Sequence, residues 1–309
     1  MRHVLIDTDT ASDDAVALIM ALRDPRVRVE AITVVAGNVP VDLGVRNALC
    51  TVEAARTYAP PVYRGAPKPM LRELFTAEFV HGSDGMGEMN LPEPALQVSD
   101  GHAVDHMIEV IRRFPGEIEI ITLGPLTNLA LACLKEPDIA PLVKSVTIMG
   151  GAGFGPGNVT PVSEFNIFAD AEAAQIVINS GLPLTFVGWD VSTDETFITQ
   201  ADLDRLTASG SEIAAFCVRC NATLKRYNLE AWGKIGIDLP DPTTVAAALE
   251  PDIVTDQVRV YSYVEYRSRD TYGQMVLDPH LLIGQPANVT IVRKIDAARF
   301  KQMLFDRLT

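Results

Sequence analysis

Four aspartates lie within eight positions near the start of the chain, namely Asp7, Asp9, Asp13 and Asp14. The first two end a short apolar run that begins at Val4 and is typical of a buried strand. Residues two apart on a strand share a face, so we expect Asp7 and Asp9 to point the same way. Carboxylates this close repel one another unless a cation lies between them, and oxygen ligands suit Ca²⁺ or Mg²⁺. The spacing therefore predicts a cation site at the end of a strand.

An apolar helix follows this strand at once, and we expect Ser12 or Asp13 to cap its N-terminus. One side of the helix carries apolar residues at helical spacing: Ala15, Leu18, Ile19 and Leu22. The alternative is that the aspartates only cap a helix on a solvated loop. A single acidic pair would fit that alternative, whereas two pairs favour a functional site.

A second polar group lies in the middle of the chain, where Asn158, Glu164 and Asn166 occur close together. Amide and carboxylate side chains offer the donors and acceptors that neighbouring hydroxyl groups need, which indicates a sugar ligand. Taken alone, these asparagines could equally be turn-forming residues.

The elements that must position these residues alternate between strand and helix patterns. Strands are predicted at 27–35, 62–63, 118–123, 143–149, 184–187, 258–266 and 289–292. Helical patterns fall between most of them and fill 199–228. Repeated strand–helix units predict an α/β fold with a mostly parallel central sheet flanked by helices, similar to a Rossmann fold. No linker or repeat divides residues 1–309, so we expect one domain, with ligands at the carboxyl ends of the strands.

Composition narrows the class of protein. A formal charge of −14 argues against nucleic acid or an anionic membrane as a partner. No apolar stretch approaches the length of a membrane span, and the first residues predict a strand in place of a signal peptide. The four cysteines indicate a reduced, cytoplasmic protein. The irregular segment 65–100 is long enough to be a functional loop or lid.

With these motifs in view, the chain resembles the inosine–uridine-preferring nucleoside hydrolase family. The resemblance rests on the opening Asp-x-Asp-x-x-x-Asp-Asp and on three later motifs over nearly the whole chain: Val35-Ala36-Gly37-Asn38, Gly124-Pro125-Leu126-Thr127-Asn128 and Glu164-Phe165-Asn166-Ile167-Phe168-Ala169-Asp170. It implies the nucleoside hydrolase fold, a homodimer or homotetramer, a bound Ca²⁺, and hydrolysis of ribonucleosides to free base and ribose.

The resemblance also implies roles for individual residues. Asp9, Asp14 and Asp241 would bind Ca²⁺ together with the backbone carbonyl of Leu123. Asp9 would also be the general base for a metal-bound water. The ribose hydroxyls would be held by five polar side chains: Asp13, Asn38, Asn158, Glu164 and Asn166. This agrees with the chemistry of the bond, since water attacks an oxocarbenium-like sugar while a carboxylate takes its proton.

One departure from the family concerns the group that protonates the departing base. Inosine–uridine-preferring relatives have a histidine before the last metal aspartate, and this chain has Pro240, which offers no proton. The base preference is therefore not predicted. Tyr227 is our first candidate for the proton donor, and His81 in the long loop is the second.

Two other functions were weighed against this one. Asp7 to Thr10 loosely resembles the Asp-x-Asp-x-Thr of haloacid-dehalogenase-type phosphatases, but the lysine and acidic pair that such enzymes need are not found downstream. The chain could also be a non-catalytic nucleoside- or Ca²⁺-binding protein. The complete acidic set, with Asp9 present, argues against that hypothesis.

Overall fold

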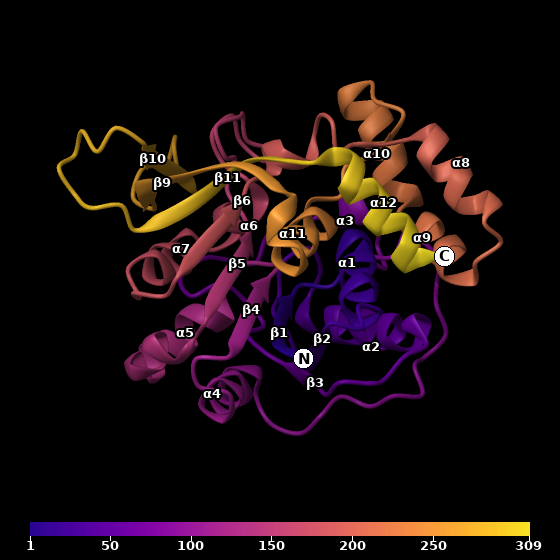
Figure 1. Cartoon of the computed structure of the whole chain (residues 1–309), viewed down its shortest axis with the longest axis horizontal. Coiled ribbons are helices and arrows are strands. Elements are labelled where there is room, and N and C mark those ends of the chain that lie inside the picture. The colour runs from indigo at the N-terminus through magenta and orange to yellow at the C-terminus, as the bar shows by residue number, and fades with distance from the viewer.

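A nine-stranded sheet forms the centre of the computed structural model, which describes all residues 1–309 (Figure 1). The strand order is β10-β9-β11-β6-β5-β4-β1-β2-β3, parallel except that β9 runs antiparallel to both neighbours. The bounds of its strands are β1 Arg2–Thr8, β2 Val27–Val34, β3 Val62–Arg64, β4 Ile118–Thr122, β5 Ser145–Met149, β6 Leu184–Val187, β9 Val254–Glu265, β10 Gln274–Asp278 and β11 Val289–Ile295. Two further short strands, β7 Ile198–Thr199 and β8 Gly236–Ile237, pair separately.

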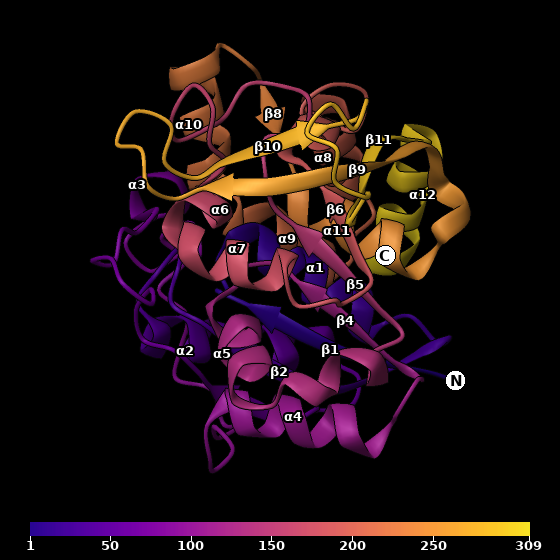
Figure 2. The same cartoon turned by 90° about the vertical axis from the view of Figure 1, so that its left-hand side faces the viewer.

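Helices cover both faces of this sheet (Figure 2). The α-helices are α1 Ser12–Leu22, α2 Val41–Ala55, α3 Glu78–His81, α4 Ala103–Arg113, α5 Thr127–Lys135, α6 Phe165–Ala169, α7 Ala171–Ile178, α8 Gln200–Ala208, α9 Glu212–Cys220, α10 Ala222–Trp232, α11 Pro240–Leu249 and α12 Ala297–Leu308. Three 3-10 helices complete the set: η1 Pro137–Leu142, η2 Trp189–Ser192 and η3 Pro251–Ile253. No helix is both long and apolar enough to span a lipid bilayer.

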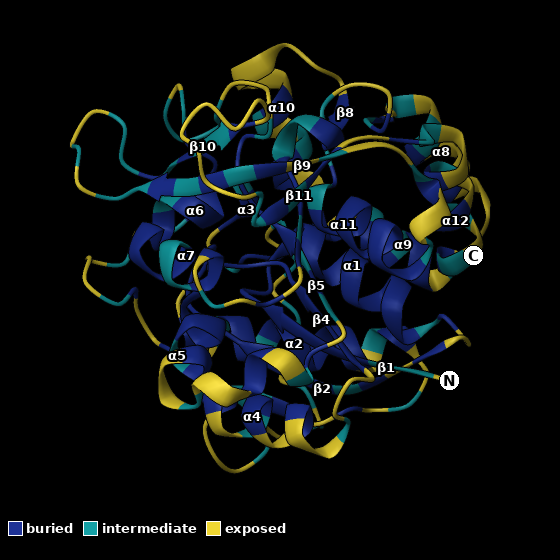
Figure 3. Ribbon diagram, turned by 60° about the vertical axis from the view of Figure 1, so that its left-hand side comes forward, coloured by how far each residue is buried: buried dark blue, intermediate teal, exposed yellow.

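Two separate cores follow from the alternation of side chains along the strands. Val4 and Ile6 of β1 belong to a cluster of 51 buried residues that includes side chains of α1, α2, α9, α11 and α12. Leu5 belongs to a second cluster, of 33 buried residues, that includes side chains of α4, α5 and α7. Figure 3 shows the central strands and α1 buried, while α4 and α8 turn exposed faces outward. Burial on both faces explains why β1 has no polar residue before Asp7 once it enters the core.

The predicted α/β architecture is confirmed, and the differences are local. The helical pattern of 199–228 is three helices, because Gly210 and Asn221 end α8 and α9. Strand β10 was not predicted; it is five residues long and pairs only with β9, at the edge of the sheet. The irregular segment 65–100 contains the short helix α3.

Strand β1 is central to the site because the order in which successive strands are added to the sheet reverses there. It pairs with β2 on one side and with β4 on the other, so the chain builds the sheet outward in both directions from β1. A crevice forms outside the carboxyl ends of strands at such a switch point. The aspartates that follow β1 lie at this crevice.

Candidate active site

The first turn of α1 positions two of the aspartates. Asp14 accepts hydrogen bonds from the backbone N–H of Ala11 at 2.9 Å and from the Thr8 hydroxyl at 2.5 Å. The predicted cap by Ser12 or Asp13 is wrong: Ala11 is the N-cap residue, and Asp14 reaches back to it from three positions on. This leaves Asp13 free to face the cavity, and one of its oxygens, Oδ1, has no hydrogen-bond partner.

Asp9 lies in a tight space between the loops that follow β2 and β4. Its Oδ2 accepts a hydrogen bond from the backbone N–H of Asn38 at 2.6 Å, and its Oδ1 has no partner. A Cβ atom on Gly37 would stand 2.1 Å from Asp9 Oδ2, and one on Gly124 would stand 2.7 Å from Asp9 Oδ1. Both glycines are thus required for the carboxylate to occupy this position.

Asp7 does not share the surroundings of Asp9. Its Oδ1 accepts hydrogen bonds from the Thr33 hydroxyl at 2.6 Å and from the Asn128 amide at 2.8 Å. Strand β1 ends at Thr8, so the two-residue alternation that was expected to align Asp7 with Asp9 does not continue to Asp9. Asp7 anchors the strand end to β2 and α5.

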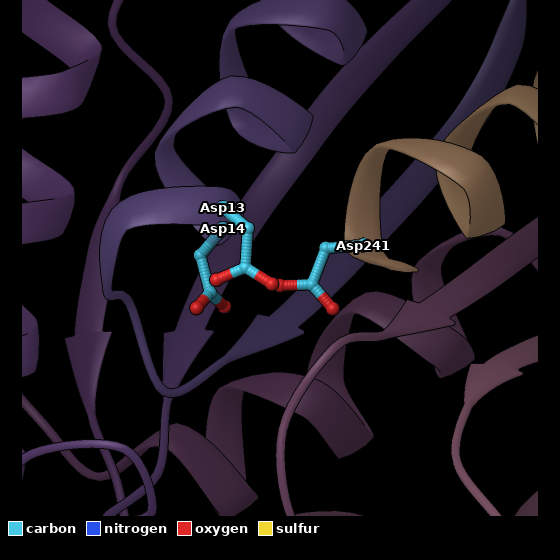
Figure 4. A group of neighbouring side chains, drawn as sticks. All are labelled: Asp13, Asp14 and Asp241. Carbon is cyan, nitrogen blue, oxygen red and sulfur yellow. The ribbon is translucent and has the colours of Figure 1, made fainter. Parts of the chain in front are cut away.

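Asp241 completes the acidic group from the N-terminus of α11, where Pro240 is the first helical residue. Figure 4 shows Asp13, Asp14 and Asp241 converging, and one oxygen of each lies within 4.8 Å of the others. Asp9 is not among these three, although its charge acts on Asp241 together with theirs. All four aspartates are buried.

Burial has a direct electrostatic consequence for these carboxyl groups. It raises the pKa of Asp13 to about 7 and that of Asp14 to about 6, and with mutual repulsion it raises the pKa of Asp9 and Asp241 well above the usual range. The nearest cationic candidate is His81, whose Nδ1 lies 3.7 Å from Asp13 Oδ1. No lysine or arginine lines the cavity. The cluster therefore lacks a counter-charge from the protein itself.

The polar residues from the middle of the chain that were predicted to bind a sugar line the same cavity. Glu164 caps α6 and accepts hydrogen bonds from the backbone N–H groups of Asn166 at 2.8 Å and Gly151 at 2.9 Å. Asn158 accepts a hydrogen bond from Phe165 N at 2.9 Å, and the Asn166 amide donates to the carbonyl of Leu123 at 2.7 Å. Asn38 lines the wall beside them. The fold thus fixes these side chains in defined orientations.

Aromatic side chains form the outer half of the cavity, which has a volume of about 710 Å³ including its open mouth. They are Phe79 from α3, Trp189 from η2, and Tyr227 and Trp232 from α10. Phe79 is 56% exposed and Trp232 is 46% exposed, so this half is open to solvent. An acidic, amide-rich floor below aromatic walls suits a ligand with a polyhydroxyl part and a flat part.

Both candidate proton donors line the cavity, as does Pro240. His81 is buried, and its Nδ1 lies 2.7 Å from the Ser12 hydroxyl, while its Nε2 has no partner in the protein. Burial lowers the pKa of His81 to about 4, against the opposing charges of Asp14 and Asp238. The Tyr227 ring contacts Phe79 edge-on, with ring centroids 5.8 Å apart.

Asp238 is a residue of this cavity that was not predicted from the sequence, and Trp189 and Phe79 are others. Each comes from a different element, and nothing in its local sequence pattern marks it. The one available signal was that Asp238 lies three residues before Asp241.

Comparisons with known proteins find similar nucleoside hydrolases over nearly the whole chain. The sequence profile described as "Inosine-uridine preferring nucleoside hydrolase" matches residues 4–302. The chain is 38% identical to the pyrimidine-specific ribonucleoside hydrolase RihA of Salmonella typhimurium, over 99% of this chain and 97% of that protein. A solved plant nucleoside hydrolase, PpNRh1, superposes with a TM-score of 0.94 at 33% identity, covering 100% of this chain and 99% of that one.

A solved purine-preferring ribonucleoside hydrolase from Gardnerella vaginalis is also similar, with a TM-score of 0.92 and 28% identity over 99% of this chain and 98% of that one. In each comparison the likeness extends over nearly the whole length of both chains. The chain therefore belongs to the inosine–uridine-preferring nucleoside hydrolase family and is an N-glycosyl hydrolase of ribonucleosides.

Proposed function

We propose that this enzyme is Ca²⁺-dependent and that Asp9 is its general base. The observation that supports this most is the set of four buried aspartates below a cavity that no lysine or arginine lines, with two unpartnered oxygens, Asp9 Oδ1 and Asp13 Oδ1. Buried carboxylates without a counter-charge are costly, and an all-oxygen donor set fits a hard divalent cation. The residues present thus fit Ca²⁺.

The proposed ligands are Asp9, Asp14, Asp241 and the carbonyl of Leu123. That carbonyl already accepts a hydrogen bond from Asn166, but a carbonyl oxygen has a second lone pair. When bound, Ca²⁺ would offset the repulsion within the cluster and lower the pKa of the attacking water. Asp9 would then take the proton of this water at Oδ1, the oxygen that no protein group occupies.

The ribose hydroxyls would be held by Asp13, Asn38, Asn158, Glu164 and Asn166, which all line the cavity. Asp13 suits binding of a ribose hydroxyl, because it reaches the cavity surface, whereas Asp9 and Asp14 are completely buried below that surface. Side chains fixed by backbone hydrogen bonds need little reorganisation when the sugar binds. They can hold the anomeric carbon in line with the attacking water.

The test of the overall function is a reducing-sugar assay on a panel of purine and pyrimidine ribonucleosides, with nitrophenyl phosphate as the phosphatase control. We expect release of free ribose from nucleosides and no hydrolysis of the phosphate ester. Nucleoside binding without ribose release would favour the binding-protein hypothesis. Light scattering on the same sample tests the proposed homodimer or homotetramer.

We propose further that Tyr227 assists departure of the base. Tyr227→Phe should lower kcat/KM for the hydrolysis of nucleosides by about 10²-fold or more, since general-acid catalysis is worth ~10²–10⁴ in rate. A nitrophenyl riboside has a leaving group that departs without protonation, so its hydrolysis should stay nearly unchanged. The measurement is kcat/KM for both substrates in the same preparation.

His81→Ala is the comparison variant for Tyr227→Phe, because both side chains line the cavity. Equal losses on both substrates for Tyr227→Phe, or no loss on either, would contradict the assignment. A nucleoside-specific loss for His81→Ala alone would then identify His81 as the donor.

A further inference from the structure

Asp238 is the one carboxylate of the cavity that lies outside the metal and ribose groups. It is in the short connection between β8 and α11 and lines the outer half of the cavity. It is only partly buried, unlike the four aspartates of the floor. The cleavage step proposed above does not use it.

Two side chains from different elements hold the Asp238 carboxylate in place. The Asn228 amide, from α10, donates to Oδ1 at 2.6 Å, and the Trp189 indole N–H, from η2, donates to Oδ2 at 3.0 Å. An indole nitrogen can only donate, so the oxygen facing it must accept. A free surface aspartate would instead sample several rotamers. The geometry is that of a pre-oriented acceptor.

Each carboxylate oxygen retains a second lone pair after these bonds. No lysine or arginine lines this cavity, and Lys234, in the neighbouring pocket that Asp238 also lines, donates instead to the carbonyl of Thr193 at 2.9 Å. The negative charge also acts on the outer half of the cavity: burial raises the pKa of Tyr227, and the charge of Asp238 raises it further. This carboxylate can therefore accept a hydrogen bond from a donor on the ligand.

We propose that Asp238 accepts a hydrogen bond from an N–H group on the edge of the nucleobase and so selects bases that carry one. The imide N–H of uracil and the N1–H of hypoxanthine are donors of this chemistry. The proposal rests on the proposed nucleoside hydrolase function and adds a base-recognition residue to it. Asn228 and Trp189 are then positioning residues, since they act through Asp238.

Methylated substrates test the proposal, because 3-methyluridine and 1-methylinosine lack the N–H in question. In the native enzyme, the parent nucleoside should exceed its methylated analogue in kcat/KM. Hydrogen bonds to a charged partner are worth about 10- to 100-fold. In Asp238→Asn this parent-to-methyl ratio should fall by about that factor, while hydrolysis of nitrophenyl riboside stays within a few-fold.

The ratio is taken within one preparation, so a smaller folded fraction cancels out of it. Asp238→Ala removes every acceptor and should lower the ratio at least as far. Trp189→Phe keeps the carboxylate but frees one oxygen, and should lower the ratio less. Asp194→Asn, an exposed aspartate of the loop after η2, is the matched control and should leave the ratio unchanged.

An unchanged parent-to-methyl ratio in both Asp238 variants would overturn the proposal. Equal losses of kcat/KM on nucleosides and on nitrophenyl riboside would also overturn it, because they would show that Asp238 only holds α10 in place. A native enzyme that hydrolyses parent and methylated nucleosides equally well would also overturn it. If the native enzyme cleaves neither nucleosides nor nitrophenyl riboside, the proposed function itself fails.

Discussion

Replacing Asp9 by asparagine should lower kcat by about 10³- to 10⁴-fold, the upper range for removal of a general base. Asparagine has nearly the same shape, so it fits between Gly37 and Gly124 and can still accept the hydrogen bond from Asn38 N. It cannot take a proton from water. Steady-state kinetics with a direct measurement of bound Ca²⁺ separates loss of the base from loss of the metal.

The comparison variant is Asp7→Asn, which alters an equally buried carboxylate two residues away that is held by Thr33 and Asn128. We expect a loss of less than about tenfold there. Asn166→Ala should raise KM as well as lower kcat, because a ribose contact acts partly in the ground state. Near-normal turnover of Asp9→Asn with Ca²⁺ still bound would refute the assignment of Asp9 as the base.

Removal of divalent cations should abolish activity, and added Ca²⁺ should restore it. Elemental analysis of the purified protein should find one Ca²⁺ per chain. Asp241→Asn should bind Ca²⁺ more weakly and lose the response to Ca²⁺, whereas Asp138→Asn, at an exposed position of η1, should behave as the native enzyme does. Protein without any divalent ion that is fully active in a strong chelator would contradict the metal proposal.

The proposed Ca²⁺ would also change how the stability of the fold depends on pH. Because burial raises the pKa of Asp13 to about 7 and that of Asp14 to about 6, these groups stabilise the metal-free fold fully only below the unfolded pKa, near 4. That stability is lost as pH rises through 6 to 7. The midpoint temperature of unfolding of the metal-free protein should therefore be lower at pH 8 than at pH 5. Added Ca²⁺ should raise this temperature most at pH 8.

The parts of this site that depend on local pattern could be predicted from the sequence. Strand β1 followed by α1 places Asp9, Asp13 and Asp14 together because the three are close along the chain. The α/β architecture follows from repeated strand and helix periods in the same way. Asp241 entered only through the family resemblance, since nothing in its own segment shows that α11 packs beside α1.

Other features depend on tertiary contacts that no local pattern encodes. Capping of α1 by Asp14 in place of Ser12 depends on the backbone conformation at Ala11. The contact of Phe79 with Tyr227 joins a short helix of the loop 65–100 to α10, and only the packed structure brings them together. Asp238 was missed for the same reason, because its meaning lies in its partners Trp189 and Asn228.

The two halves of the cavity are built by different elements and differ in exposure to solvent. The acidic and amide-rich half is built on strand ends and on α1, α6 and α11, whereas the aromatic half comes from α3, η2 and α10. Changes in the rigid half disturb the core, but changes in the aromatic half touch side chains as exposed as Phe79 and Trp232. Substitutions among these exposed aromatic side chains can therefore change the fit of the base with little disturbance of the core.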